Sequence, residues 1–175
     1  YKRQIEHQRE SPPGNPPRLP IERSQLSPDG SLLATASTDL TVRLWDTTTG
    51  VLISQMAHED IVNAAVFSPD GKRLATASHD NTARIWDVQT GLPITPPLKH
   101  KDDVLQVIFS SDGRRLATAS RNRDARVWDT ETGQPLTAYL QHEYPVNDID
   151  FSPDSQFLVT GGNDGVARLW SVASG

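Results

Sequence analysis

The sequence predicts an all-β fold made of consecutive copies of one four-stranded antiparallel unit. Tryptophans recur at spacings of 41, 42 and 42 residues, and the aspartates of four turns keep the same spacings: Trp45, Trp86, Trp128 and Trp170, with Asp29, Asp70, Asp112 and Asp154. Histidines recur every 42 residues, at His58, His100 and His142. A period of this size, with a Trp-Asp pair closing one strand, is typical of a β-propeller blade. We therefore expect four blades that form a partial propeller or an arc of a larger ring.

The copy at residues 58–99 shows how each strand is expected to form. Short runs rich in Val, Ile, Leu, Thr and Trp predict strands near residues 62–67, 73–78, 82–86 and 92–98. The turn at residues 68–71, Ser-Pro-Asp-Gly, joins the first two strands, because Pro presets φ and Gly adopts the left-handed conformation that a short hairpin needs. Asp87 and Gly91 play the same part before the fourth strand. One such sheet cannot bury both faces, so each blade must be covered by its neighbours.

The period also divides the chain. We expect a polar, Pro-rich linker over residues 1–20, followed by blades at residues 21–57, 58–99, 100–141 and 142–175. Blade one is expected to be degenerate or incomplete, because its first strand, residues 21–26, is more polar than residues 62–67. Blade four should lack its fourth strand. The missing initiator Met predicts that the chain belongs to something longer.

These residues resemble the WD-repeat β-propeller family over roughly residues 17–175. The resemblance implies a ring of blades that serves as a non-catalytic platform for protein partners. It also implies a hydrogen-bonded structural tetrad of His, Ser or Thr, Asp and Trp in each blade. Carried over by position, the tetrads are His58, Thr76, Asp80 and Trp86; His100, Thr118, Asn122 and Trp128; His142, Thr160, Asp164 and Trp170; and, in blade one, Thr35, Asp39 and Trp45, with Pro17 at the His position. Asn122 stands where the family has Asp, which implies a weaker tetrad in blade three.

The same resemblance places partner contacts on one face of the ring, at the entry to the first strand and just before the tetrad Asp. We call these positions the rim: Ile61, Asn63, His79, Asp103, Leu105, Arg121, Pro145, Asn147 and Asn163. They differ between copies while the framework does not, as expected of a binding surface on variable loops. Neutral drift of solvated positions would give the same contrast, so both interpretations stay open. The turn from Arg121 to Asp124 diverges most, which makes it the best single candidate for a specific contact.

No pattern predicts a catalytic, cofactor or metal site. The His, Thr and Asp of a tetrad offer the residue types of a hydrolytic relay, but such a relay is defined by geometry, and these sets recur from blade to blade. No Cys or paired-His spacing suggests a metal. An arginine lies two residues before each tryptophan, at Arg43, Arg84, Arg126 and Arg168. We expect their heads to pair with local carboxylates; an anion-binding stripe is the alternative.

Composition narrows the function classes. A net charge of −5 argues against a general nucleic-acid binder, and no apolar run approaches the roughly 20 residues of a membrane span. The lack of cysteine fits a reducing, cytoplasmic location. The leading hypothesis is a protein-interaction scaffold in a larger signalling protein. The alternatives are an architectural fragment that self-associates through its open blade edges and, with less support, an enzyme with a channel-mouth site.

Overall fold

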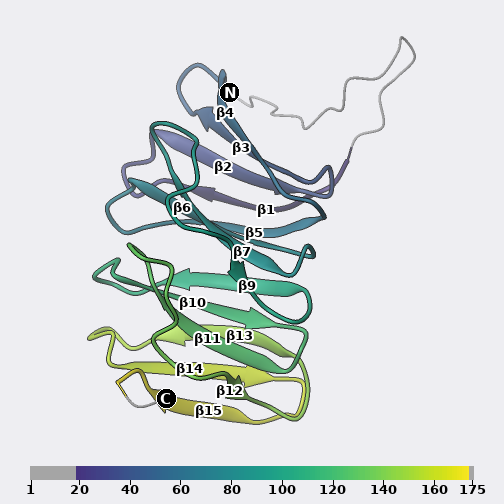
Figure 1. Ribbon diagram of the computed structural model, residues 1–175. Helices are drawn as coiled ribbons and strands as arrows, with labels where there is room; N and C mark the ends of the chain where they lie inside the picture. Colours follow the sequence, from purple (N-terminus) through teal and green to yellow (C-terminus); the bar gives the residue numbers. More distant parts are fainter. Residues whose placement is uncertain (1–18, 174–175) are drawn as a thin grey trace.

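A computed structural model describes residues 19–173, in which every regular element is a strand and no helix could cross a membrane. The strands form four antiparallel sheets that stack face to face in chain order (Figure 1). Blade one contains β1 (Ile21–Leu26), β2 (Leu32–Ser37), β3 (Thr41–Asp46) and β4 (Leu52–Ala57). Blade two contains β5 (Val62–Phe67), β6 (Arg73–Ser78), β7 (Thr82–Asp87) and β8 (Leu98–Lys99). Blade three contains β9 (Val104–Phe109), β10 (Arg115–Ser120), β11 (Asp124–Asp129) and β12 (Leu140–Gln141). Blade four contains β13 (Val146–Phe151), β14 (Phe157–Gly162) and β15 (Ala167–Ser171).

The first hairpin of each blade forms for local chemical reasons that blade two illustrates. The Ser68 hydroxyl donates to Asp70 Oδ1 at 2.5 Å, and the Lys72 backbone N–H donates to the same oxygen at 3.1 Å. Gly71 has a φ of 69°, in the left-handed region that a side chain disfavours. The backbone N–H of Ser68 then donates to the Arg73 carbonyl and starts the ladder between β5 and β6. The turn and the first three strands of this blade therefore lie within one residue of the prediction.

The fourth strand of blade two was predicted wrongly. Residues 92–98 form no continuous strand: only an isolated bridge at Pro93 and the short β8 pair with β7. Residues 93, 96 and 97 are prolines, which have no N–H to donate to a ladder. The fourth strand of blade one, β4, contains no proline and runs for six residues.

The ends of the stack differ from the expectation in one respect. Blade one was expected to be degenerate or incomplete; it has all four strands, so the second alternative is wrong. Its polar first strand, β1, is exposed along its whole length, which explains why it tolerates polar residues. Blade four has three strands within the described residues. Most of the predicted linker, including Pro17, lies outside the described residues.

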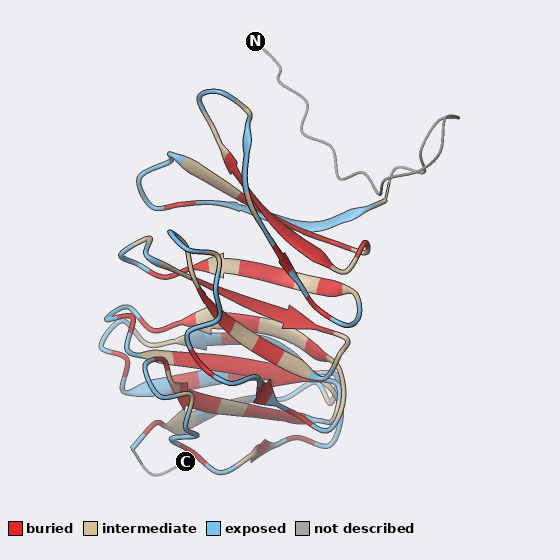
Figure 2. Cartoon of the chain, turned by 45° about the horizontal axis from the view of Figure 1, so that its top comes forward, coloured by how far each residue is buried: buried red, intermediate tan, exposed pale blue. Residues whose placement is uncertain are grey.

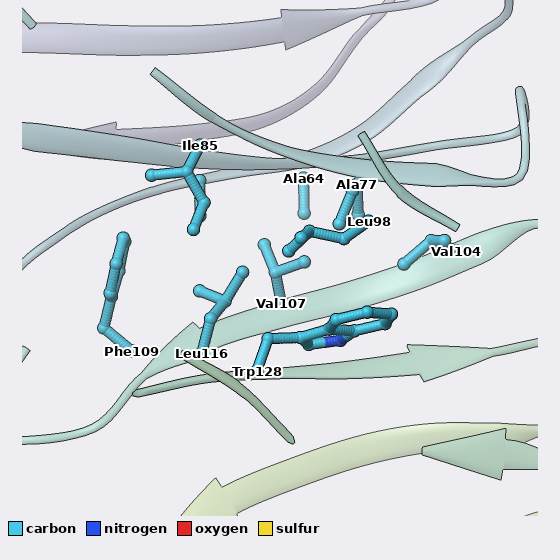
Figure 3. Close-up of a cluster of buried hydrophobic side chains, with 11 residues drawn as sticks. Ala64, Ala77, Ile85, Leu98, Val104, Val107, Phe109, Leu116 and Trp128 are labelled. Atoms are coloured by element: carbon cyan, nitrogen blue, oxygen red, sulfur yellow. The ribbon is translucent and has the colours of Figure 1, made fainter. Parts of the chain in front are cut away.

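The hydrophobic core lies between neighbouring sheets (Figure 2). Between blades one and two, residues Ala34, Ala36, Val42, Leu44 and Met56 pack with Val62, Ala65, Phe67, Leu74 and Trp86. Equivalent clusters join blade two to blade three (Figure 3) and blade three to blade four. The first strands lie side by side, with β5 in contact with both β1 and β9. Each blade is therefore stabilised by burial against the next one.

Candidate functional site

The four tetrad residues of blade two form one hydrogen-bonded chain. Trp86 Nε1 donates to Thr76 Oγ1 at 2.9 Å, and this hydroxyl lies 2.7 Å from His58 Nε2. His58 Nδ1 lies 2.8 Å from Asp80 Oδ2. A carboxylate only accepts, so Nδ1 carries the proton; in the neutral imidazole, Nε2 then accepts from the Thr76 hydroxyl. The chain links β7 through β6 to the loop before β5.

The Asp80 carboxylate is held in its charged form. Burial alone would raise its pKa, but hydrogen bonds from His58 and Thr82 outweigh that effect and lower the pKa of Asp80 well below its usual range. The Thr82 hydroxyl donates to Asp80 Oδ1 at 2.6 Å, and the Glu59 N–H donates to Oδ2 at 3.1 Å. Both oxygens of this buried group are therefore satisfied within the blade.

Blade four has the same arrangement. Trp170 Nε1 donates to Thr160 Oγ1 at 2.8 Å, His142 Nε2 lies 2.7 Å from that oxygen, and His142 Nδ1 lies 3.1 Å from Asp164. The Arg168 guanidinium donates to Asp164 at 2.6 Å, and this bond lowers the pKa of the carboxyl. The position-by-position assignment thus brings together all four residues in blades two and four.

Blade three departs from the assignment at Asn122. His100 Nδ1 lies 2.9 Å from Asp124 Oδ1, and Asn122 Nδ2 donates to Asp124 Oδ2 at 2.9 Å. Thr118 completes the chain by accepting from Trp128 Nε1 at 2.9 Å. The expectation that Asn122 takes the place of the tetrad Asp is wrong, because the carboxylate is supplied two residues later, at the start of β11.

Blade one keeps the described part of its tetrad. Trp45 Nε1 donates to Thr35 Oγ1 at 2.9 Å, and the Asp39 carboxylate accepts from the Thr41 hydroxyl at 2.6 Å and from Arg43 at 2.9 Å. The position of its histidine, residue 17, lies outside the described residues. Within the described residues, the hydrogen bond between Trp45 and Thr35 is therefore preserved.

Three of the four arginines beside the tryptophans behave as expected. Arg43, Arg84 and Arg168 lie 2.9, 3.8 and 2.6 Å from the aspartate four residues earlier. Arg126 has no carboxylate there. Its guanidinium lies 4.2 Å from the ring centre of Tyr139, and its Nε donates to the Thr137 carbonyl at 3.1 Å. The prediction of a carboxylate partner is wrong for Arg126, because Asn122 occupies that position.

The rim residues lie in the loops before the first strand and before the third strand of blades two to four, and at the start of the first strand. Arg121, Asn147 and Asn163 are exposed, and the others are half-buried: Ile61, Asn63, His79, Asp103, Leu105 and Pro145. Blades two and three meet in a cluster centred on Asp103, whose carboxylate lies 3.1 Å from Arg121 and 3.8 Å from His79. In blade four, Asn147 donates to Asn163. The structure thus brings three rim residues into one cluster and leaves the blade-four pair separate.

Sequence reasoning missed that Asp124 supplies the tetrad carboxylate of blade three and that Tyr139 packs against Arg126. The available signal was a joint change at positions 122 and 124, from Asp-x-Thr in blade two to Asn-x-Asp in blade three. Among the described residues, no group of three or more His, Cys, Asp or Glu could hold a metal ion.

Comparison with known proteins agrees with this geometry. The crystal structure of the computationally designed Ika4 protein matches with a TM-score of 0.80 and 23% sequence identity, over 92% of this chain and 95% of that one. This likeness shows the fold alone. A search of curated proteins found no match. The family model described as WD domain, G-beta repeat matches residues 22–46, 50–87, 94–129 and 133–171, which together make up most of the sequence. The chain therefore belongs to the WD domain, G-beta repeat family.

Proposed function

We propose that the chain is a non-catalytic interaction module that binds protein partners at its rim. The observation that carries this proposal is the cluster of Arg121, Asp103 and His79, which joins two blades at a surface where the blades differ. Arg121 is 54% exposed even though it pairs with Asp103. Exposed arginines held by a neighbour suit protein recognition, because less side-chain entropy is lost on binding.

The tetrads favour a structural role over catalysis. In blades two, three and four the Thr hydroxyl accepts from a tryptophan and the His ring lies against a carboxylate, so both groups already have partners. The same network occurs in each of these blades, whereas a catalytic site needs a unique convergence of groups. The tetrads thus support a rigid platform that presents the rim.

Composition supports protein partners in the cytoplasm. The net charge of −5 disfavours binding to phosphate backbones, and the absence of cysteine fits a reducing compartment. The role that we assign on this basis is that of a protein-binding scaffold.

Replacing Arg121 with Glu tests the proposal. The chain and its variants would be immobilised on a solid support and incubated with extract from the source organism. The bound proteins would then be quantified by mass spectrometry. We expect Arg121→Glu to lose a specific subset of partners with an unchanged circular dichroism spectrum. Arg114→Glu is the matched control, because Arg114 is exposed in the turn at the opposite end of β10.

Retention of every partner by Arg121→Glu would contradict the proposal. Partner loss with both variants would indicate a general charge effect rather than recognition at the rim.

A further inference from the structure

The two end blades expose apolar positions that the inner blades bury. In blade four, Leu169 is 66% and Val159 is 42% exposed. Their equivalents in the other blades are fully buried against the following blade: Leu44, Ile85 and Val127 for Leu169, and Ala34, Ala75 and Ala117 for Val159. We call this surface, formed by Val159, Ala167 and Leu169, the tail face.

Blade one exposes the opposite half of the same interface. Leu26 is 56% and Ile21 is 41% exposed on β1, which is drawn in pale blue in Figure 2. Their equivalents pack onto the preceding blade: Phe67 and Phe109 for Leu26, and Val62, Val104 and Val146 for Ile21. We call the surface formed by Ile21, Leu26 and Leu33 the head face.

The tail and head faces are therefore the two sides of an interface that the chain already forms three times. We propose that the tail face of one copy binds the head face of a second copy. Each side would bury the positions that its internal equivalents bury, and burial of large apolar side chains is the main driving force of such contacts. The proposal is independent of partner binding at the rim, because no rim residue belongs to either face.

A polar contact extends the match beyond hydrophobic burial. Between blades one and two, Gln25 Oε1 accepts from the backbone N–H of Phe67 at 2.7 Å. By the repeat register, Asp150 is the equivalent of Gln25, and Leu26 is the equivalent of Phe67. In the proposed contact, Asp150 would therefore face the Leu26 N–H of a second copy, as Gln25 faces Phe67, whereas Val66 and Ile108 hold this position in the other two blades. Burying the Asp150 carboxylate at this contact would cost free energy, and a hydrogen bond from the Leu26 N–H would offset that cost.

The contact is heterologous, because head and tail are different surfaces. Each copy has one of each, so two copies close a ring if their rotation allows it. A ring of two four-bladed copies has eight blades, which lies within the range of about four to eight for propellers.

Solution mass tests the contact directly. We expect the chain to form a dimer of twice 19.3 kDa in sedimentation equilibrium at concentrations up to about 200 μM. Leu169→Glu removes the tail and Leu26→Glu removes the head, so each variant alone should sediment as a monomer. Leu92→Glu is the control, because Leu92 is 64% exposed in a loop outside both faces and should leave the dimer intact. Circular dichroism checks that each variant folds.

Mixing the two variants distinguishes head-to-tail binding from other pairings. The intact head of Leu169→Glu should bind the intact tail of Leu26→Glu, so the mixture should give a 1:1 complex at raised concentration. An assembly larger than a dimer that both substitutions abolish would also support the contact. It would mean that the rotation between neighbouring copies does not close a ring of two. A wild-type chain that stays monomeric throughout would overturn the proposal. Dimerisation that only one substitution prevents would show a symmetric contact between like faces and would overturn it too.

Discussion

At the scale of single residues, the tetrad requires a carboxylate near the histidine but not at a fixed sequence position. Asp80 fills that place in blade two and accepts from Thr82, whereas Asp124 fills it in blade three and accepts from Asn122. The two positions lie within one hydrogen bond of each other, so either can supply the charge. In both blades the pair consists of one carboxylate that accepts and one side chain that donates to it: Thr82 to Asp80 in blade two, and Asn122 to Asp124 in blade three.

This equivalence predicts the outcome of transplanting the blade-three pair into blade two. Asp80→Asn alone removes the charge-assisted bond to His58 and should cost about 1–3 kcal/mol of unfolding free energy. Asp80→Asn combined with Thr82→Asp should recover most of the loss, as measured by urea denaturation. Thr82→Asp alone should destabilise the blade, because two carboxylates then share the site. A double variant no more stable than Asp80→Asn would contradict this explanation.

The same carboxylate predicts how stability depends on pH. The pKa of Asp80 is lower in the folded chain than the usual 3.8, which applies when the chain unfolds. Its contribution is therefore fully present above about pH 4 and is lost as pH falls through and below that value. Urea denaturation at pH 6 and pH 3 should show a smaller loss for Asp80→Asn than for the wild type. An equal loss in both proteins would assign the acid sensitivity to other groups, such as Asp70 and Asp112, whose pKa values are also lowered.

At the scale of elements, sequence reasoning succeeded where local chemistry decides the structure. The turns and the first three strands of blade two follow from Pro, Asp and Gly at fixed offsets and from runs of β-forming residues. The fourth strand of blade two needs backbone N–H groups to pair with β7, and its prolines have none. The apolar residues of this segment predicted a strand because they carry no information about these missing donors. The tetrad role of Asp124 was missed because sequence spacing does not show which of two polar positions, two residues apart, faces His100.

A pair of glycines separates backbone strain from packing. Gly30 and Gly133 have φ values of 73° and 71°, so an alanine at either should cost about 1–2 kcal/mol through its left-handed conformation. A Cβ at Gly133 would also lie 2.9 Å from the Cβ of Thr95 in the preceding blade, whereas nothing lies within 4 Å of one at Gly30. Thermal denaturation should therefore show a larger loss for Gly133→Ala than for Gly30→Ala. Equal losses of stability in the two variants would mean that Thr95 moves away from the added Cβ at little cost in free energy.

At the scale of the whole molecule, the sequence repeat and the sheet are offset by one strand. The matched segment 50–87 contains β4 of blade one and β5 to β7 of blade two, and the next two segments repeat this relation. Each repeat thus ties two neighbouring sheets together covalently. Side chains add to the link: Arg73 of blade two donates to the Gly113 carbonyl of blade three at 2.9 Å. The stability of each blade should therefore depend on its neighbours. Blades one and four each have one uncovered face, and blade four, with three strands within the described residues, should be the weaker of the two.

Native-state hydrogen exchange tests this order and the association of copies together. At low concentration, amides of β14 should exchange faster than the equivalent amides of β6, because β6 is covered by a blade on each side and β14 on only one. Raising the concentration should slow exchange in β14 and β2 more than in β6, since the head-to-tail contact covers both end blades. Leu169→Glu should abolish that concentration dependence, whereas Leu92→Glu should keep it. Equal protection of β14 and β6 at low concentration would mean that the blades open as one cooperative unit, with no weak end for a second copy to protect.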